Sequence, residues 1–168
     1  MKPKFCPKCA GRLSFVENRE GKTHPVCRSC GFVFYQNAKP TASALILNDQ
    51  DKVLLLKRAI DPSCGKWDIP GGFLEESEDP IDCLRREVRE ELGAECEAGE
   101  IVAVCVDRYG EGEDSFYTLN LYYKTQIDVE QIKLDLENSE YRWLGKDEIP
   151  WNELAFANTA VALTALYR

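Results

Sequence analysis

The sequence predicts a layered domain of the α/β or α+β class, preceded by a small unit of a different kind. Beyond residue 40, strand-like apolar segments alternate with two segments whose apolar residues have helical spacing. The first 39 residues instead contain two closely spaced cysteine pairs and carry the opposite net charge. We therefore expect two modules, residues 1–39 and residues 40–168.

The composition is that of an ordinary folded protein. With 168 residues, 44% of them hydrophobic and 30% charged, the chain can bury a core of its own. Disordered, collagen-like and coiled-coil chains are excluded, and no apolar run approaches the ~20 residues that span a bilayer. Because the N-terminus also lacks the apolar stretch of a secretory signal, we expect a cytoplasmic protein with no membrane partner.

Net charge separates the two modules. Residues 1–39 hold eight Lys or Arg and two Glu, a charge of +6, whereas residues 40–168 hold 13 basic and 27 acidic side chains, a charge of −14. The acidic body argues against nucleic acid as a partner, since affinity for nucleic acid depends on neutralising its phosphates. The basic segment leaves a local phosphate contact open.

Four of the eight cysteines form two Cys-x-x-Cys pairs, Cys6 with Cys9 and Cys27 with Cys30. Two such pairs predict a closed, four-thiolate Zn²⁺ site. We expect this zinc to be structural, because a closed site leaves no position for water. A redox Cys-x-x-Cys is the alternative. The single histidine, His24, could replace a thiolate, but four cysteines already complete the site.

Strands and helices follow from apolar patterning in the second module. The helix predicted at Asp79–Leu92 has Asp79 as its cap, Pro80 in its first turn and Gly93 at its end. A second segment with helical spacing is Glu153–Tyr167. Strands are predicted at five apolar segments: Thr41–Leu47, Lys52–Lys57, Ile101–Val106, Phe116–Ile127 and Tyr141–Leu144.

Three carboxylates are expected on one face of the first helix. Glu87, Glu90 and Glu91 are spaced i, i+3 and i+4, and like charges at this spacing repel. The repulsion is relieved if divalent cations bind there, since Mg²⁺ prefers oxygen ligands and two such ions can neutralise a diphosphate and activate water. A solvated helix face with Glu–Arg pairs, such as Arg86–Glu90, is the alternative.

The segment around this helix resembles the Nudix box at each polar and glycine position. Its last position holds Ala94, where the box usually has a bulky aliphatic residue. The matching pattern is Gly72, five residues, Glu78, seven residues, Arg86-Glu87-Val88, one residue, Glu90-Glu91, one residue and Gly93.

The resemblance implies a fold for each module. Residues 40–168 are similar to a Nudix domain, an α/β/α sandwich, and Lys66–Gly72 looks like the strand that enters the box. Residues 1–39 resemble the zinc ribbon of NADH-pyrophosphatase-like members. However, the downstream motif usual in NADH pyrophosphatases does not occur after Gly93, so the ribbon alone does not indicate NADH as the substrate.

Roles for individual residues are implied by the same resemblance. Glu87, Glu90 and Glu91 match positions that bind Mg²⁺ or Mn²⁺, and Glu87 is also a candidate to activate water. The carbonyl of Gly72 matches a further metal contact. Glu78 and Arg86 match a pair that holds the loop against the helix. The family sometimes places the general base outside the box, and the candidates here are Glu111, Glu113, Asp114 and Glu140.

The implied reaction is hydrolysis of a nucleoside diphosphate linked to another group, releasing a nucleoside monophosphate. The other group stays open among ADP-ribose, nucleotide sugars, dinucleotides and nucleotide cofactors. Arg58 and Lys66 could meet phosphate oxygens, and Tyr109 could stack on a base, as could Phe116 or Tyr35. The contrasting hypothesis is a non-catalytic ribbon module that senses a nucleotide or contacts RNA. The sequence also leaves open whether the ribbon forms a homodimer.

Overall fold

The computed structural model describes residues 3–127 and 132–168. Its chain divides into two compact units, one of residues 1–38 with 110–116 and the other of residues 39–109 with 117–168. The division of the chain into domains at residue 39 stays a prediction, and each unit is described by itself. Among the described residues, no helix has the length and apolar character to span a membrane.

The first unit is built around an antiparallel hairpin of β1 (Leu13–Glu17) and β2 (Thr23–Cys27). The side chain of Asn18 closes the turn, because its Oδ1 accepts from the backbone N–H groups of Glu20 and Lys22, both at 2.9 Å. The hairpin register sets Leu13 opposite Cys27, so the second cysteine pair begins where β2 ends. The 3₁₀ turn Gly112–Asp114 belongs to the same unit.

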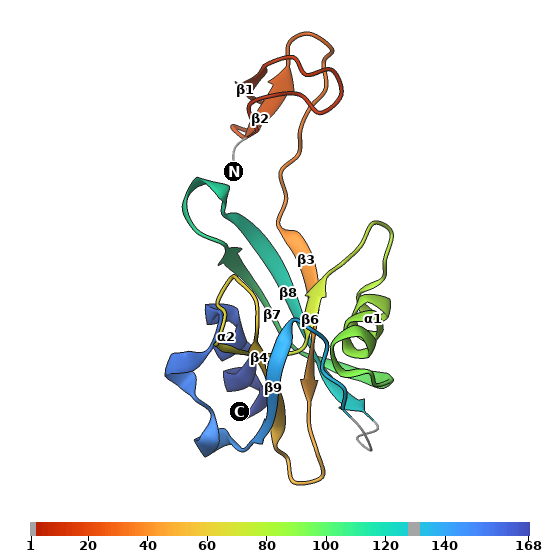
Figure 1. Cartoon of the computed structure of the whole chain (residues 1–168). Helices are drawn as coiled ribbons and strands as arrows, with labels where there is room; N and C mark the ends of the chain where they lie inside the picture. The colour runs from red at the N-terminus through yellow and green to blue at the C-terminus, as the bar shows by residue number, and fades with distance from the viewer. Residues whose placement is uncertain (1–2, 128–131) are drawn as a thin grey trace. The chain divides into compact units, whose positions relative to one another are not determined.

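The second unit contains two sheets and two helices among its described residues (Figure 1). The first sheet has the order β6-β3-β8-β7, with β3 parallel to β8, and the second has the order β5-β4-β9. Short 3₁₀ turns lie at Lys146–Glu148 and Trp151–Glu153. The strands are β3 (Lys39–Ile46), β4 (Val53–Arg58), β5 (Trp67–Asp68), β6 (Gly71–Phe73), β7 (Cys96–Tyr109), β8 (Phe116–Ile127) and β9 (Asn138–Leu144).

Helix α1 (Pro80–Leu92) begins and ends at the residues its sequence indicates. The carboxylate of Asp79 accepts from the N–H of Ile81 at 2.9 Å, and Gly93 ends the helix in the left-handed region with φ of 63°. Its apolar side, with Leu84, Val88 and Leu92 fully buried, packs on the sheets. The opposite side therefore keeps the charged residues of the helix at the surface of the sandwich.

Helices α1 and α2 (Ala157–Leu166) lie on opposite sides of the sheets (Figure 1). Two buried clusters account for this layering. One joins α1 to β3 and β4, and the other joins Ala162 and Leu163 of α2 to Leu45, Val53 and Leu55 on the same strands. Alternate residues of a strand point to opposite faces, so each strand contributes to both cores. The predicted α/β/α layering is confirmed.

Candidate active site and thiolate cluster

A cavity of roughly 440 Å³ lies in the second unit, where α1 meets β6. The carboxylates of Glu87, Glu90 and Glu91 line it, together with the backbone of Gly71 and Gly72. The three glutamates that the sequence placed on one helix face are therefore brought to one concave surface.

Arg86 neutralises part of this acidic wall. Its Nη1 donates to Glu87 Oε1 at 2.7 Å and to Glu90 Oε2 at 3.2 Å. Its Nε and Nη2 donate to the two oxygens of Glu78 at 2.8 and 3.0 Å, and Nη2 also donates to the Phe73 carbonyl at 3.1 Å. The Arg86 guanidinium holds the pKa of the Glu78 carboxyl at about 2. Arg86 thus fastens the loop before α1 to the helix while facing two cavity carboxylates.

Two glycines allow the helix and β6 to approach each other. A Cβ on Gly71 would collide with the backbone of Ala42 and Ser43, and its φ of 144° is rarely adopted by other residues. A Cβ on Gly72 would collide with the carboxylate of Glu87. The glycine pair therefore decides how closely β6 passes both β3 and the acidic helix face.

Glu91 is the most deeply placed of the three glutamates. Its Oε2 accepts from the Gly71 N–H at 2.9 Å and its Oε1 from Asn138 Nδ2 at 3.3 Å. Burial raises the pKa of Glu91 to about 8 against the opposing hydrogen bond from Gly71, and the nearby charge of Glu87 adds to the rise. A cation bound beside Glu91 would lower this pKa and favour the ionised carboxylate.

The pattern of glycines, arginine and glutamates on this wall is that of one protein family. A NUDIX domain matches residues 37–166 of the chain. This chain belongs to the Nudix family. The family predicted from the box is confirmed, and the match covers the second unit except its last two residues.

Several known Nudix proteins are similar to this chain. A Caenorhabditis elegans protein named NAD-capped RNA hydrolase ndx-9 is 32% identical over 93 residues, which cover 55% of this chain and 24% of that protein. The human 8-oxo-dGDP phosphatase NUDT18 is 39% identical over 61 residues, covering 36% of this chain and 19% of that protein. The chain therefore spans a quarter or less of the length of these two relatives.

A solved structure resembles nearly the whole chain. The crystal structure of a Nudix hydrolase from Nitrosomonas europaea superposes with a TM-score of 0.79 at 31% identity. The superposition covers 96% of this chain and 88% of that one.

The donor set of the Nudix cavity fits a hard divalent cation. Carboxylate oxygens from Glu87, Glu90 and Glu91 face one cavity, and Mg²⁺ or Mn²⁺ is bound through such oxygens. Glu87 and Glu90 share the Arg86 guanidinium, which shows that the acidic wall already accepts a cationic partner. The ligand atoms of the glutamates lie farther apart than those of the four paired cysteines. Among residues 3–127 and 132–168, only that cysteine group has all its ligand atoms within 4.8 Å of one another.

Aromatic rings and an arginine line another part of the Nudix cavity. Tyr109 lies edge-to-face with Phe73, with ring centroids 5.5 Å apart, and 5.6 Å from the ring of Phe156. The Arg58 guanidinium lies 5.4 Å from the centroid of the Phe156 ring and 3.7 Å from the carboxylate of Asp68. Rings and a guanidinium are the groups on which a planar base can stack.

The predicted site residues do not all reach this cavity. Arg58 and Tyr109 line it, as do the three glutamates and Gly72, whereas Lys66 does not and instead donates from Nζ to the Asn152 carbonyl at 3.5 Å. Glu140 lies outside the cavity and accepts from Arg142 Nε at 2.6 Å. The other three base candidates, Glu111, Glu113 and Asp114, belong to the first unit.

Some cavity residues were missed by the sequence analysis. Asp135 and Glu137 line the cavity from the segment before β9, and Phe156 from the segment before α2. Each lies far along the chain from the Nudix box, and no local spacing connects them to it. Only a prediction of how the segment before β9 packs on α1 could have found the first two.

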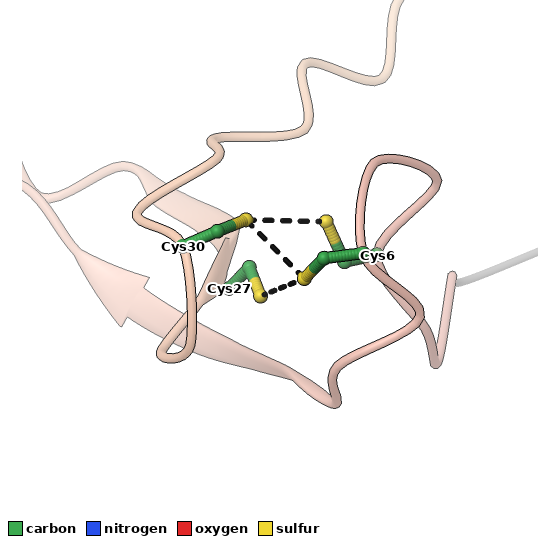
Figure 2. A group of neighbouring side chains, drawn as sticks. Cys6, Cys27 and Cys30 are labelled. Carbon is green, nitrogen blue, oxygen red and sulfur yellow. Dashed lines mark hydrogen bonds between the residues drawn. The ribbon is translucent and has the colours of Figure 1, made fainter.

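The four paired cysteines form a second cluster, in the first unit. Cys9 Sγ lies 3.5 Å from Cys27 Sγ and 3.4 Å from Cys30 Sγ, and Cys6 Sγ lies 3.7 Å from Cys30 Sγ. Figure 2 shows the sulfur atoms of Cys6, Cys27 and Cys30 turned toward one another. A tetrahedral Zn²⁺ with bonds of about 2.3 Å to sulfur needs sulfur atoms about 3.8 Å apart, which these distances approach.

The surroundings of the cluster favour the thiolate at Cys27 but the thiol at Cys9. A backbone hydrogen bond from Gly11 lowers the pKa of Cys9, but hydrogen bonds with Cys30 and Cys27 raise it to about 12 overall. Burial raises the pKa of Cys27, but hydrogen bonds from the backbone of Cys30 and Ser29 lower it to about 6 overall. Thiolate is the form that binds a metal ion. The four-cysteine group can therefore hold zinc, as the pair spacing predicted.

Proposed function

We propose that the protein is a metal-dependent Nudix pyrophosphohydrolase that cleaves the diphosphate linkage of a nucleoside diphosphate joined to another group. The observation that carries the proposal is the composition of one cavity. Carboxylates able to hold divalent cations and rings able to stack on a base line the same roughly 440 Å³ space. A nucleoside diphosphate derivative presents both of the matching groups.

Glu87, Glu90 and Glu91 would hold Mg²⁺ or Mn²⁺, with the Gly72 carbonyl as a further candidate ligand. A bound ion of this kind neutralises diphosphate charge and lowers the pKa of a coordinated water. Arg86 keeps the glutamates and the preceding loop in place through its hydrogen bonds to Glu78 and Glu87. These chain residues bind and orient, and their geometry is present before substrate arrives.

Proton transfer from the attacking water requires a carboxylate that reaches the cavity. Glu87 meets this condition, and so do three acidic residues outside the box, Asp68, Asp135 and Glu137. Of these, Asp68 already accepts from Thr159 Oγ1 at 2.7 Å and lies 3.7 Å from the Arg58 guanidinium. Glu140 does not, because its side chain is engaged with Arg142 and with Lys57 outside the cavity. Asp135 and Glu137, rather than Glu140, are therefore the candidates for a general base outside the Nudix box.

The other end of the substrate would lie against Tyr109, Phe73 and Phe156, with Arg58 close to phosphate or base. The relatives named above act, by their names, on NAD-capped RNA and on 8-oxo-dGDP, which share a nucleoside joined to a diphosphate. This common part agrees with the proposed substrate class. The group attached to the diphosphate is left to experiment.

The first unit would bind one Zn²⁺ through Cys6, Cys9, Cys27 and Cys30, with a structural role. All four positions of a tetrahedral ion would be filled by thiolates, so this ion would not activate water.

A substrate panel tests the proposed activity. ADP-ribose, NADH, UDP-glucose, a dinucleoside polyphosphate, 8-oxo-dGDP and a nucleoside triphosphate are each incubated with Mg²⁺, Mn²⁺, Ca²⁺ or chelator. We expect a nucleoside monophosphate from at least one substrate with Mg²⁺ or Mn²⁺, little with Ca²⁺, whose looser coordination misplaces the nucleophile, and none in chelator. Nucleotide binding without turnover under every condition would instead support the non-catalytic module.

A further inference from the structure

Strand β9 contains a β-bulge beside the cavity. In its antiparallel pairing with β4, Glu140 lies opposite Lys57 but Asn138 lies opposite Arg58, so Ser139 is an additional residue of β9. In a regular strand Asn138 and Glu140 would point to the same face, and the additional residue turns them to opposite faces.

The residues of β4 that lie opposite Asn138 and Glu140 show to which face of the sheet each of these side chains points. Arg58, opposite Asn138, lines the cavity. Lys57, opposite Glu140, lies over the ring of Trp67 and 3.7 Å from the Glu140 carboxylate. The bulge therefore directs Asn138 to the cavity side of the sheet and Glu140 away from it.

The amide of Asn138 joins two carboxylates. Its Nδ2 donates to Glu91 Oε1 at 3.3 Å and to Asp135 Oδ1 at 3.1 Å, and the residue is only 8% exposed. With the Gly71 N–H at 2.9 Å from Oε2, both oxygens of Glu91 have donors fixed by the fold. The oxygens of Glu87 and Glu90 instead accept from the longer, charged side chain of Arg86.

The segment before β9 is fastened to the end of α1. The N–H groups of Lys133 and Asp135 donate to the carbonyls of Leu92 and Glu91, at 2.9 and 3.3 Å. The carboxylate of Asp135 also accepts from the Glu137 N–H at 3.1 Å. Since Asp135 and Glu137 line the cavity, this segment adds two carboxylates to those of the Nudix box.

We propose that Asn138 is a positioning residue for the Nudix reaction, whose amide orients the Glu91 carboxylate and ties it to the segment that carries Asp135 and Glu137. The inference rests on the proposed function, because it treats Glu91 as a metal ligand. Groups that hydrogen-bond metal ligands typically change metal affinity or activity by 10–100-fold when they are replaced.

Asn138→Leu tests the proposal, since leucine has a similar volume but no donor. Asn138→Ser is a milder variant that keeps a shorter donor, and Asn152→Leu is the matched control on an exposed position of the same unit. Mn²⁺ binding to the protein is measured from the decrease in the electron paramagnetic resonance signal of free Mn²⁺. The zinc content of each variant is confirmed first. Steady-state rates are measured on a substrate that the wild type hydrolyses.

We expect Asn138→Leu to weaken Mn²⁺ binding by about tenfold or more and to lower kcat by a similar factor with KM changed less than about threefold. Asn138→Ser should fall between it and the wild type, and Asn152→Leu should match the wild type. If Asn138→Leu does not fold, Asn138→Ser decides alone, with a severalfold loss of Mn²⁺ affinity expected.

Unchanged Mn²⁺ affinity and kcat in a folded Asn138 variant would overturn the inference while leaving the proposed function intact. A wild type that binds no Mn²⁺ and hydrolyses no substrate would overturn the proposed function itself. A loss of thermal stability alone, with Mn²⁺ affinity and kcat unchanged, would reduce Asn138 to a structural residue and also count against the inference.

Discussion

The cysteine cluster and the acidic cavity are assembled in different ways. Each Cys-x-x-Cys pair comes from one tight turn, so the sequence spacing nearly specifies the cluster. The cavity combines one helix face with β6, with β4 and with the segment before β9, which are brought together by the fold. A site made of local turns can be predicted from the spacing of its residues. In the cavity, spacing could predict only the part that lies on the helix.

The two regions also differ in how charge is balanced. The four sulfur atoms surround a common point and can share one Zn²⁺ in a closed site. The glutamates instead share Arg86 and border an open cavity, so cations and substrate can enter and leave. This contrast predicts that metal loss unfolds the first region and inactivates the second.

Cys27→Ser should have the largest structural effect. Losing one thiolate releases the Zn²⁺, and a small unit without a sufficient core then loses its order. Hydrogen exchange should become fast throughout residues 3–38 while α1 and the sheets of the second unit stay protected. Cys64→Ser, at an exposed cysteine outside the cluster, is the control. Unchanged zinc content in the Cys27 variant would remove the basis for the four-thiolate site.

Gly72→Ala should disturb the cavity without touching the cysteines. The added methyl collides with the Glu87 carboxylate, and such overpacking costs about 1–3 kcal/mol. We expect a lower unfolding midpoint and a lower kcat, with zinc content unchanged. In the control Gly145→Ala, the methyl comes no closer than 3.3 Å to its nearest neighbour, the Glu148 carboxylate, so both quantities should stay near the wild type. Wild-type activity for Gly72→Ala would show that the close approach of β6 and α1 is not required.

The Glu78–Arg86 pair should have the smallest effect, which is present at neutral pH and lost in acid. The pKa of Glu78 is lowered to about 2 from an ordinary value of 4.5, so its ionised form stabilises the fold above about pH 4.5. That stabilisation is lost as pH falls from about 4.5 toward 2. Thermal unfolding across this range should show the wild type losing its advantage over Glu78→Gln. A constant difference between the two at every pH would contradict the ion pair.

Prediction from sequence succeeded where the signals were local. The helix predicted at Asp79–Leu92 is α1, because Asp79 supplies a cap and Gly93 a left-handed end. The predicted helix Glu153–Tyr167 is shorter in the structure, where α2 begins at Ala157. Leu154 forms a bridge with Trp67, and the Ala155 N–H donates to the Trp67 carbonyl at 2.8 Å, so pairing with β5 keeps these residues extended. Tertiary contact overrides helical spacing here.

The candidate site shows the same limit. The spacing of Glu87, Glu90 and Glu91 was sufficient to place them together, since one helix carries all three. Asn138 was missed because it precedes the predicted strand Tyr141–Leu144, and the bulge at Ser139, which turns Asn138 and Glu140 to opposite faces, has no local signal in the sequence. Arg58 and Phe156 meet only through the fold, so their contact could not be read from the sequence.

The central claim is that the acidic face of α1 holds catalytic metal. It is tested most directly by Glu90→Gln and Glu91→Gln, with exposed Glu97→Gln as control, through unfolding in chelator beside initial rates in saturating Mg²⁺. Removing like charge should leave unfolding in chelator unchanged or raise its midpoint, while lost metal binding lowers turnover by about a hundredfold or more. Near wild-type turnover in both variants would contradict the metal site.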